Sequence, residues 1–193
     1  MGAKVVCGLD EVGRGALAGP MWAAAVILPV GFTHPLLRDS KQLTPKQRET
    51  AAEAIYQGAD LIRCAFIEAP IIDRIGIQAA NRMIFEGLIN GIEADEFLVD
   101  GTLRLETHKS YQSIIRGDSL YPCIAAASII AKVRRDHQMI ELSEQCPEYQ
   151  WAGNKGYGSA AHMDAIRRLG PHPQHRRSFI KSIAPPSVIS SEV

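Results

Sequence analysis

The sequence predicts an α/β fold, and three observations support that prediction. Short apolar runs alternate with longer segments of helical character, glycine-rich turns follow some of the apolar runs, and two segments begin with helix-capping sequences. The chain has 193 residues, of which 46% are hydrophobic and 22% are charged, so it can bury a core without disulfide bonds or a structural metal. Intrinsic disorder and fibrous repeats are excluded.

Four apolar runs predict strands, at residues 4–9, 21–28, 61–67 and 96–99. Gly13 and Gly15 follow the first run in a turn, and the fourth run ends at Asp100-Gly101. The polar residues 38–43 predict a loop. The first and fourth strands are therefore followed by segments in which the main chain can bend sharply.

Four helices are expected, at residues 45–57, 71–90, 124–146 and 160–169. Thr44 is a suitable N-cap for the first, with Pro45 at the first helical position and Gln47 three residues after the cap. Ser159 can cap the last helix, and Gly170-Pro171 ends it.

We expect a single domain over residues 1–183, with a flexible tail at 184–193. The longest apolar stretch, residues 16–32, is interrupted by glycine and proline and is too short to cross a membrane. No zinc or redox site is expected from the four cysteines, which form no CxxC pair: Cys7, Cys64, Cys123 and Cys146. These features predict a cytoplasmic protein with no membrane contact.

Charge is unevenly distributed, although the net charge is zero. Residues 1–103 hold 9 Lys and Arg against 13 Asp and Glu, whereas residues 104–193 hold 12 against 8. This asymmetry is typical of a protein that binds cations in one place and phosphates in another. A solvated surface with chance asymmetry is the alternative.

Two sets of basic residues in the second half leave more than one interpretation open. The first set lies on the third predicted helix and faces either a nucleic-acid backbone or solvent: Lys132, Arg134 and Arg135. The second set is expected to form a phosphate-facing or solvated tail in preference to a metal site: His172, His175, Arg176 and Arg177. His137 and His162 are expected to be packing or surface residues, and Ser128 a buried serine and not a nucleophile.

Four acidic residues stand at the ends of predicted elements: Asp10 and Glu11 after the first strand, Asp100 after the fourth, and Asp118 before the third helix. Carboxylates that meet at strand ends repel one another unless a divalent cation lies between them, and all-oxygen ligands favour Mg²⁺ or Mn²⁺ over zinc. A single Asp-Gly pair is more often only a turn. Two adjacent acids after a buried strand, however, would cost stability without a partner.

Several blocks of the sequence resemble the motifs of ribonuclease HII, the type 2 ribonucleases H. The first block is GLDEVGRGALAGP at residues 8–20. The others follow in the order of the family: 39–43 (DSKQL), 99–101 (VDG), 117–118 (GD), 125–133 (AAASIIAKV) with 135–136 (RD), 156–159 (GYGS), 162 (H) and 175–179 (HRRSF). The resemblance covers about residues 4–180, nearly the whole chain.

This resemblance implies a ribonuclease H-like fold, in which helices flank a mixed five-stranded sheet and a helical C-terminal part spans about residues 140–180. It implies a catalytic domain that hydrolyses the phosphodiester on the 5′ side of a ribonucleotide. The substrates would be RNA–DNA hybrids and duplex DNA with single embedded ribonucleotides, as in ribonucleotide excision repair. The products would carry 3′-hydroxyl and 5′-phosphate ends.

The resemblance also assigns roles to individual residues. The four acids match the catalytic, metal-binding set, which would hold Mg²⁺ or Mn²⁺, two ions per site during catalysis: Asp10, Glu11, Asp100 and Asp118. The substrate contacts would come from a turn that recognises the 2′-hydroxyl, a lysine near the phosphates and a tyrosine that packs on the junction sugar: Gly13, Arg14, Gly15, Lys41 and Tyr157. Glycines on both sides of Tyr157 make a poor core scaffold, which disfavours a core tyrosine.

The chain departs from the family pattern at Gly76, where many relatives have asparagine, so one phosphate contact is expected to be missing or replaced. Two other functions stay open: a different nuclease of the same superfold, and a non-catalytic nucleic-acid-binding protein. We expect a monomer without an obligate protein partner, and no sliding-clamp contact, because residues 182–193 contain no paired aromatic anchor.

Overall fold

The structure is a computed structural model that describes residues 4–37 and 40–183, apart from the side chain of Lys41. The expected tail at 184–193 lies outside the described residues. The chain divides into two compact units, which are described separately. The sheet unit comprises Met1–Val12, Trp22–Phe66 and Asn81–Arg134, and the helical unit comprises Gly13–Met21, Ile67–Ala80 and Arg135–Val193.

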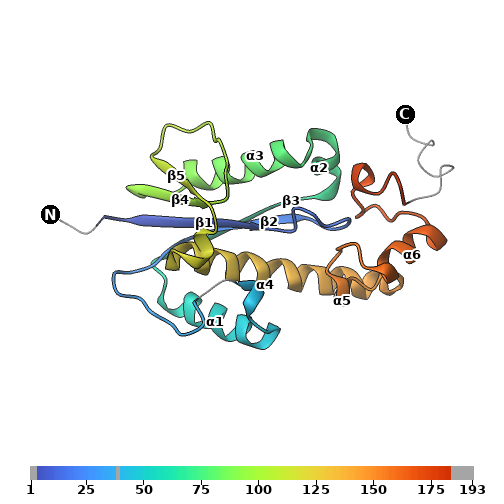
Figure 1. The fold of residues 1–193 in the computed structure, drawn as a ribbon, viewed down its shortest axis with the longest axis horizontal. Coiled ribbons are helices and arrows are strands. Elements are labelled where there is room, and N and C mark those ends of the chain that lie inside the picture. Colours follow the sequence, from blue (N-terminus) through green and yellow to red (C-terminus); the bar gives the residue numbers. More distant parts are fainter. Residues whose placement is uncertain (1–3, 38–39, 184–193) are drawn as a thin grey trace. The chain divides into compact units, whose positions relative to one another are not determined.

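A mixed sheet of five strands, in the order β3-β2-β1-β4-β5, forms the centre of the sheet unit (Figure 1). Strand β1 pairs antiparallel with β2 and parallel with β4, and β4 pairs parallel with β5. The bounds are β1 Val6–Val12, β2 Met21–Ile27, β3 Leu61–Ile67, β4 Glu96–Asp100 and β5 Tyr111–Ile114. The α/β class and the mixed five-stranded sheet are therefore confirmed, and β5 is the strand that the apolar runs did not reveal.

The helices follow the sequence prediction at three of four positions. They are α1 Pro45–Gly58, α2 Ala69–Ile75, α3 Ile77–Asn90, α4 Pro122–Gln145, α5 Trp151–Asn154 and α6 Ala160–Leu169, with 3₁₀ turns at Ser40–Gln42, Gly117–Ser119, Pro147–Tyr149 and Arg177–Phe179. The Thr44 capping box and the Ser159 N-cap are both present. The single helix expected at 71–90 is wrong, and part of the expected 38–43 loop is a 3₁₀ turn.

Gly76 causes the break between α2 and α3. Its main chain has φ 81° and ψ 153°, a conformation that is essentially restricted to glycine. The apolar periodicity continues through this residue, so the sequence pattern alone indicated one continuous helix.

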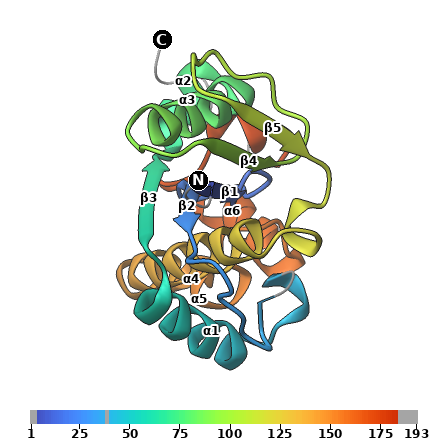
Figure 2. The same ribbon diagram turned by 90° about the vertical axis from the view of Figure 1, so that its left-hand side faces the viewer.

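Helices cover both faces of the sheet in the sheet unit (Figure 2): α3 lies on one face, and α1 with the first part of α4 lies on the other. Alanines and isoleucines of α4 pack with Ala24, Val26 and the buried face of α1. A Cβ atom at Gly8 would lie 2.3 Å from the carbonyl carbon of Cys123, so α4 lies directly against β1 at this glycine.

The helical unit has a smaller core, built around Trp151, which is fully buried. Met139 of α4 and Ile166 of α6 belong to the same cluster. Among the helices of the described residues, none combines the length and the apolar character that crossing a membrane would need.

Candidate active site

The register of two parallel strands brings the first pair of acids together. Leu9 of β1 is paired with Val99 of β4, so the next residues, Asp10 and Asp100, stand beside each other. Glu11 follows on β1. Asp10 and Glu11 therefore lie within β1, which extends to Val12, and not after its end as the sequence indicated, whereas Asp100 is the last residue of β4. The structure brings the three acids close together.

Asp10 is almost completely buried, with 6% of its surface exposed. Its Oδ1 atom accepts a hydrogen bond of 2.7 Å from the main-chain N–H of Glu11. Burial raises the pKa of Asp10 well above its usual value, and the carboxylates of Glu11 and Asp100 raise it further, whereas a hydrogen bond from Ser128 opposes these effects. Ser128 is buried, as expected, and its hydroxyl also lies 2.9 Å from that of Ser40.

A second contact ties the end of β4 to the turn that carries Asp118. The main-chain N–H of Gly117 donates a hydrogen bond of 2.7 Å to Oδ1 of Asp100. Asp118 follows on the 3₁₀ turn Gly117–Ser119 and is 7% exposed. The preceding residue, Arg116, has φ 56°, which directs the chain into this turn. Asp10, Glu11, Asp100 and Asp118 are called the acid site below.

The chemistry of the acid site fits a divalent cation. It offers carboxylate oxygens, which are the ligands of Mg²⁺ and Mn²⁺, and the burial and carboxylate repulsion that raise the pKa of Asp10 would be offset by a bound cation. Within residues 4–37 and 40–183, no three His, Cys, Asp or Glu side chains are already arranged as a metal-binding group. A cation would therefore have to draw the carboxylates of this site together.

The glycine turn (residues 13–15) belongs to the helical unit, and its two glycines differ. Gly13 has φ +88°, and a Cβ atom there would lie 2.1 Å from Nε of Arg135, so the fold itself requires glycine. Gly15 is exposed, its φ is not positive, and a Cβ atom there would meet nothing within 4 Å. Nothing in the described structure requires glycine at position 15.

The tyrosine turn (residues 154–158) presents Tyr157, which is 37% exposed and does not belong to the core. Gly156 has φ +78°, and a Cβ atom there would lie 2.3 Å from the carbonyl oxygen of Ala18. The main-chain N–H groups of Leu17 and Ala18 donate hydrogen bonds of 2.8 Å and 3.2 Å to the carbonyl oxygen of Gly156. The segment after the glycine turn is thereby joined to the tyrosine turn within the helical unit.

Three basic residues that the sequence analysis placed on the surface are buried. Arg135 and Arg176 have no exposed surface, and His175 is 2% exposed, so the expectation of a solvated or phosphate-facing position is wrong for them. Arg134 is exposed as expected, with Nε 2.8 Å from the hydroxyl of Tyr56. Lys41 lies in the 3₁₀ turn Ser40–Gln42, and its side chain is outside the described part of the structure.

A histidine network supports the tyrosine turn, and sequence reasoning missed it. Nδ1 of His162 lies 2.9 Å from the carbonyl oxygen of Tyr157, and Nε2 of His162 accepts a hydrogen bond of 3.0 Å from Nε1 of Trp151. Nε2 of His175 lies 3.0 Å from the same Nε2 of His162. Nδ1 of His175 accepts a hydrogen bond of 2.8 Å from the main-chain N–H of His172. These contacts require neutral imidazoles, and burial lowers the pKa of His175 to about 3.

Comparison with known proteins gives one family. The profile of the Ribonuclease HII family matches residues 7–182. Ribonuclease HII of Syntrophus aciditrophicus is 45% identical over 190 residues, which cover 97% of this chain and 90% of that protein. Ribonuclease HII of Paramagnetospirillum magneticum is 46% identical over 185 residues, which cover 91% of this chain and 90% of that protein. The crystal structure of ribonuclease H2 from Pyrococcus horikoshii has a TM-score of 0.78 at 25% identity, covering 93% of this chain and 96% of that chain.

Proposed function

Because the chain belongs to the ribonuclease HII family, whose members are endoribonucleases that degrade RNA in RNA–DNA hybrids, we propose that it cuts on the 5′ side of a ribonucleotide. The proposal covers long hybrids and single ribonucleotides embedded in duplex DNA, with 3′-hydroxyl and 5′-phosphate products. The observation that supports it most strongly is the burial of Asp10 beside Glu11 and Asp100 on two adjacent strands.

The family depends on divalent metal ions, and we propose that the acid site holds Mg²⁺ or Mn²⁺, two ions during catalysis. When bound, such ions activate the attacking water and stabilise the leaving 3′-oxygen. Asp10 and Asp100 would hold the ions from fixed strands, and Asp118 would approach from its turn. The N–H of Gly117, bonded to Asp100, keeps one oxygen of that carboxylate in a defined direction.

The glycine turn and Tyr157 would recognise the ribonucleotide. Position 15 is open to solvent and free of any steric need for glycine, which supports a close approach of main chain to a sugar. The 2′-hydroxyl is the group that distinguishes RNA from DNA at one position. Arg14 would contact the substrate from the same turn, Tyr157 would pack on the junction sugar with its exposed ring, and Lys41 would face the backbone phosphates.

The test is incision of duplex DNA that carries one ribonucleotide, compared with the same duplex without it, in Mg²⁺, in Mn²⁺ and in chelator. We expect one cut, 5′ of the ribonucleotide, that is abolished by chelator and by Asp10→Asn. Mapping of the ends should give a 3′-hydroxyl and a 5′-phosphate. Cutting of both duplexes would contradict ribonucleotide recognition, and binding without cutting would contradict catalysis.

We further propose that residues 1–183 act as one catalytic domain and that the enzyme is a cytoplasmic monomer without an obligate protein partner. The cysteines support a reducing compartment, because all four are free: Cys7, Cys64, Cys123 and Cys146. Sedimentation of the protein alone and with a nicked or hybrid duplex measures the oligomeric state, and a dimer in both conditions would contradict the monomer.

A further inference from the structure

Arg135 lies in the middle of α4, where the helix enters the helical unit, and is fully buried. Its guanidinium joins two loops. Nε donates to the carbonyl oxygen of Pro20 at 2.9 Å, and Nη2 donates to that of Ala18 at 3.2 Å. Nη1 donates to the carbonyl oxygen of Lys155 at 2.8 Å. The guanidinium therefore connects the segment after the glycine turn with the tyrosine turn.

Arg176 acts on the glycine turn in the same manner. It is also fully buried, and Nη1 donates a hydrogen bond of 2.9 Å to the carbonyl oxygen of Arg14, the central residue of that turn. Nε and Nη2 both donate to the carbonyl oxygen of Gly19, at 3.1 Å and 3.0 Å. The main-chain N–H of Arg176 donates to the carbonyl oxygen of Leu17 at 2.8 Å.

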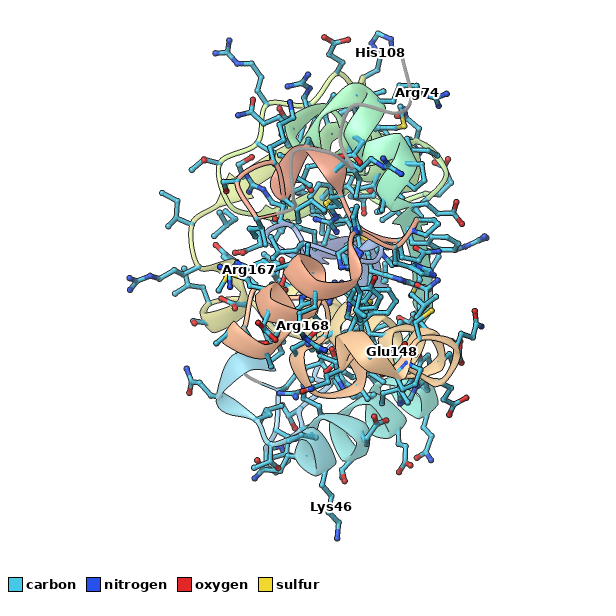
Figure 3. The ribbon with its side chains drawn as sticks, turned by 90° about the vertical axis from the view of Figure 1, so that its right-hand side faces the viewer. Lys46, Arg74, His108, Glu148, Arg167 and Arg168 are labelled. Atoms are coloured by element: carbon cyan, nitrogen blue, oxygen red, sulfur yellow. The ribbon has the colours of Figure 1, made fainter. Side chains whose placement is uncertain are left out.

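The burial of these two guanidinium groups is costly. The partners of both groups are main-chain carbonyl oxygens, which carry no formal charge. Burial and, to a smaller extent, the neighbouring Arg135 together lower the pKa of Arg176 to about 9, although Tyr157 and Asp73 act in the opposite direction. By contrast, Arg167 and Arg168 of α6 are exposed at the surface (Figure 3), where a guanidinium keeps its water. In return, the two guanidinium groups donate hydrogen bonds to main-chain carbonyl oxygens of both loops and so fix the paths of these loops.

Arg135 also contacts the ring of Tyr157 and the glycine turn. The guanidinium carbon of Arg135 lies 5.3 Å from the centre of the Tyr157 ring, within the range of a cation–π contact. Arg135 also fills the space that a Cβ atom of Gly13 would need. The two groups with proposed substrate contacts in the helical unit, the glycine turn and Tyr157, are thus held by one pair of side chains.

We propose that Arg135 and Arg176 are positioning residues for ribonucleotide recognition, which fix the main chain of the glycine turn and the ring of Tyr157 before substrate binds. This inference rests on the proposed function of those two elements. Neither arginine touches the substrate. A fixed turn spares the enzyme the ordering of a loop during binding, and a displacement of about 1 Å in such a turn can cost about 10²-fold in rate.

The kinetic test uses Arg135→Lys and Arg176→Lys, which keep the positive charge but lose the planar guanidinium group with its several N–H donors. The matched control is Arg168→Lys, which makes the same exchange at an exposed arginine of α6 in the same unit. On duplex DNA with one ribonucleotide, kcat/KM should fall about 10²-fold for either buried arginine and stay unchanged for the control. Thermal melting by circular dichroism establishes that each variant is folded.

A double-mutant cycle separates positioning from a loss of folded enzyme. If Arg135 acts through Tyr157, Arg135→Lys should lower kcat/KM by no more than about threefold in a Tyr157→Ala background. The same holds for Arg176→Lys in a Gly15→Ala background. A loss of folded enzyme would lower activity by the same factor in both backgrounds. Equal factors, or full activity of both lysine variants, would overturn the proposal.

A spectroscopic measurement does not depend on catalysis. In protein labelled with fluorotyrosine, the ¹⁹F resonance of Tyr157, assigned with Tyr157→Phe, should shift in Arg135→Lys and stay in place in Arg168→Lys. An unchanged resonance in Arg135→Lys would overturn the positioning of the ring. If the wild-type enzyme fails to cut at ribonucleotides while the resonance shifts, the proposed function fails and the structural part of this inference stands.

Discussion

The acid site of the sheet unit and the glycine turn of the helical unit are positioned by different means. Asp10 and Asp100 take their places from the register of paired strands, which is a property of the main chain. The glycine turn is held by two side chains that are far from it in the sequence, because Arg176 donates to the carbonyl oxygen of Arg14 and Arg135 packs against Gly13. The acid site is thus fixed by main-chain pairing, and the glycine turn by side-chain contacts from distant parts of the sequence.

Burial in the two regions disfavours charges of opposite sign. In the acid site, burial and repulsion disfavour the ionised form of Asp10. In the helical unit, burial disfavours the protonated form of His175. Each cost should be visible as a separate dependence of stability on pH and on substitution.

The largest effect is expected for Asp10→Asn. Activity should fall by roughly 10²–10³-fold or more, since a charge that acts in the transition state is removed. In chelator, the melting temperature should rise by about 2–4 °C for each kcal/mol of repulsion relieved. Glu53→Gln on the exposed side of α1 is the control and should change neither quantity. A lower melting temperature for Asp10→Asn would show that repulsion at this site has been overstated.

The next effect separates the two glycines of one turn. Gly15→Ala should lower kcat/KM at an embedded ribonucleotide by about 10²-fold without changing the melting temperature, because the added Cβ atom meets only open space. Gly13→Ala should cost about 1–3 kcal/mol in the free energy of unfolding, because of its positive φ and its contact with Arg135. Urea denaturation measures the stability of each variant, and steady-state kinetics measures its kcat/KM. Equal stability losses in Gly13→Ala and Gly15→Ala would contradict the difference between the two glycines.

The pH dependence of stability should have two opposing parts in metal-free protein. The folded-state pKa of His175, about 3, lies below the ordinary 6.5, so stability is full above pH 6.5 and is lost as the pH falls towards 3. The folded-state pKa of Asp10 lies above the ordinary 3.8, so its contribution is lost as the pH rises above 3.8. Urea denaturation across pH 4–8 should show the acid-side loss flattened in His175→Gln and the alkaline-side loss flattened in Asp10→Asn. Unaltered curves in these variants would contradict both assignments.

The smallest effect is expected at Gly76, which joins α2 and α3 and lies outside both sites. Gly76→Asn, which introduces the residue expected from the family resemblance, should lower the free energy of unfolding by about 1 kcal/mol, since asparagine is strained at φ 81° and ψ 153°. Urea denaturation measures the free energy of unfolding, and a binding titration with the substrate duplex measures the affinity. A gain in affinity would support the expected loss of a phosphate contact in this chain, and an unchanged stability would contradict the strain.

The acids could be predicted from the sequence because strand ends and carboxylates are local features. Asp10, Glu11 and Asp100 follow apolar runs directly, and their neighbourhood follows from pairing of those runs. Strand β5 could not be found in the same way, because Tyr111–Ile114 is short and its central residues are exposed. Its existence came from the resemblance alone.

The buried basic residues could not be predicted for a different reason. Arginine is ordinarily exposed, so the sequence near Arg176 indicated a phosphate-facing or solvated tail. The carbonyl oxygens that satisfy Arg176 belong to Arg14 and Gly19, and no local pattern links these segments. The signals that could have pointed to burial were indirect, since Arg135 and Arg176 lie inside blocks that resemble the family.

The choice of carbonyl oxygens as partners has a consequence for protein engineering. Every residue has a carbonyl, so the hydrogen bonds from Arg176 to Arg14 and from Arg135 to Lys155 do not depend on the side chains at positions 14 and 155. A library of variants at the exposed position 14 should keep the loop in place while it changes the group offered to a nucleic acid, whereas position 155, with φ 51°, favours glycine or asparagine. Substrate preference could then be retuned on an unchanged scaffold.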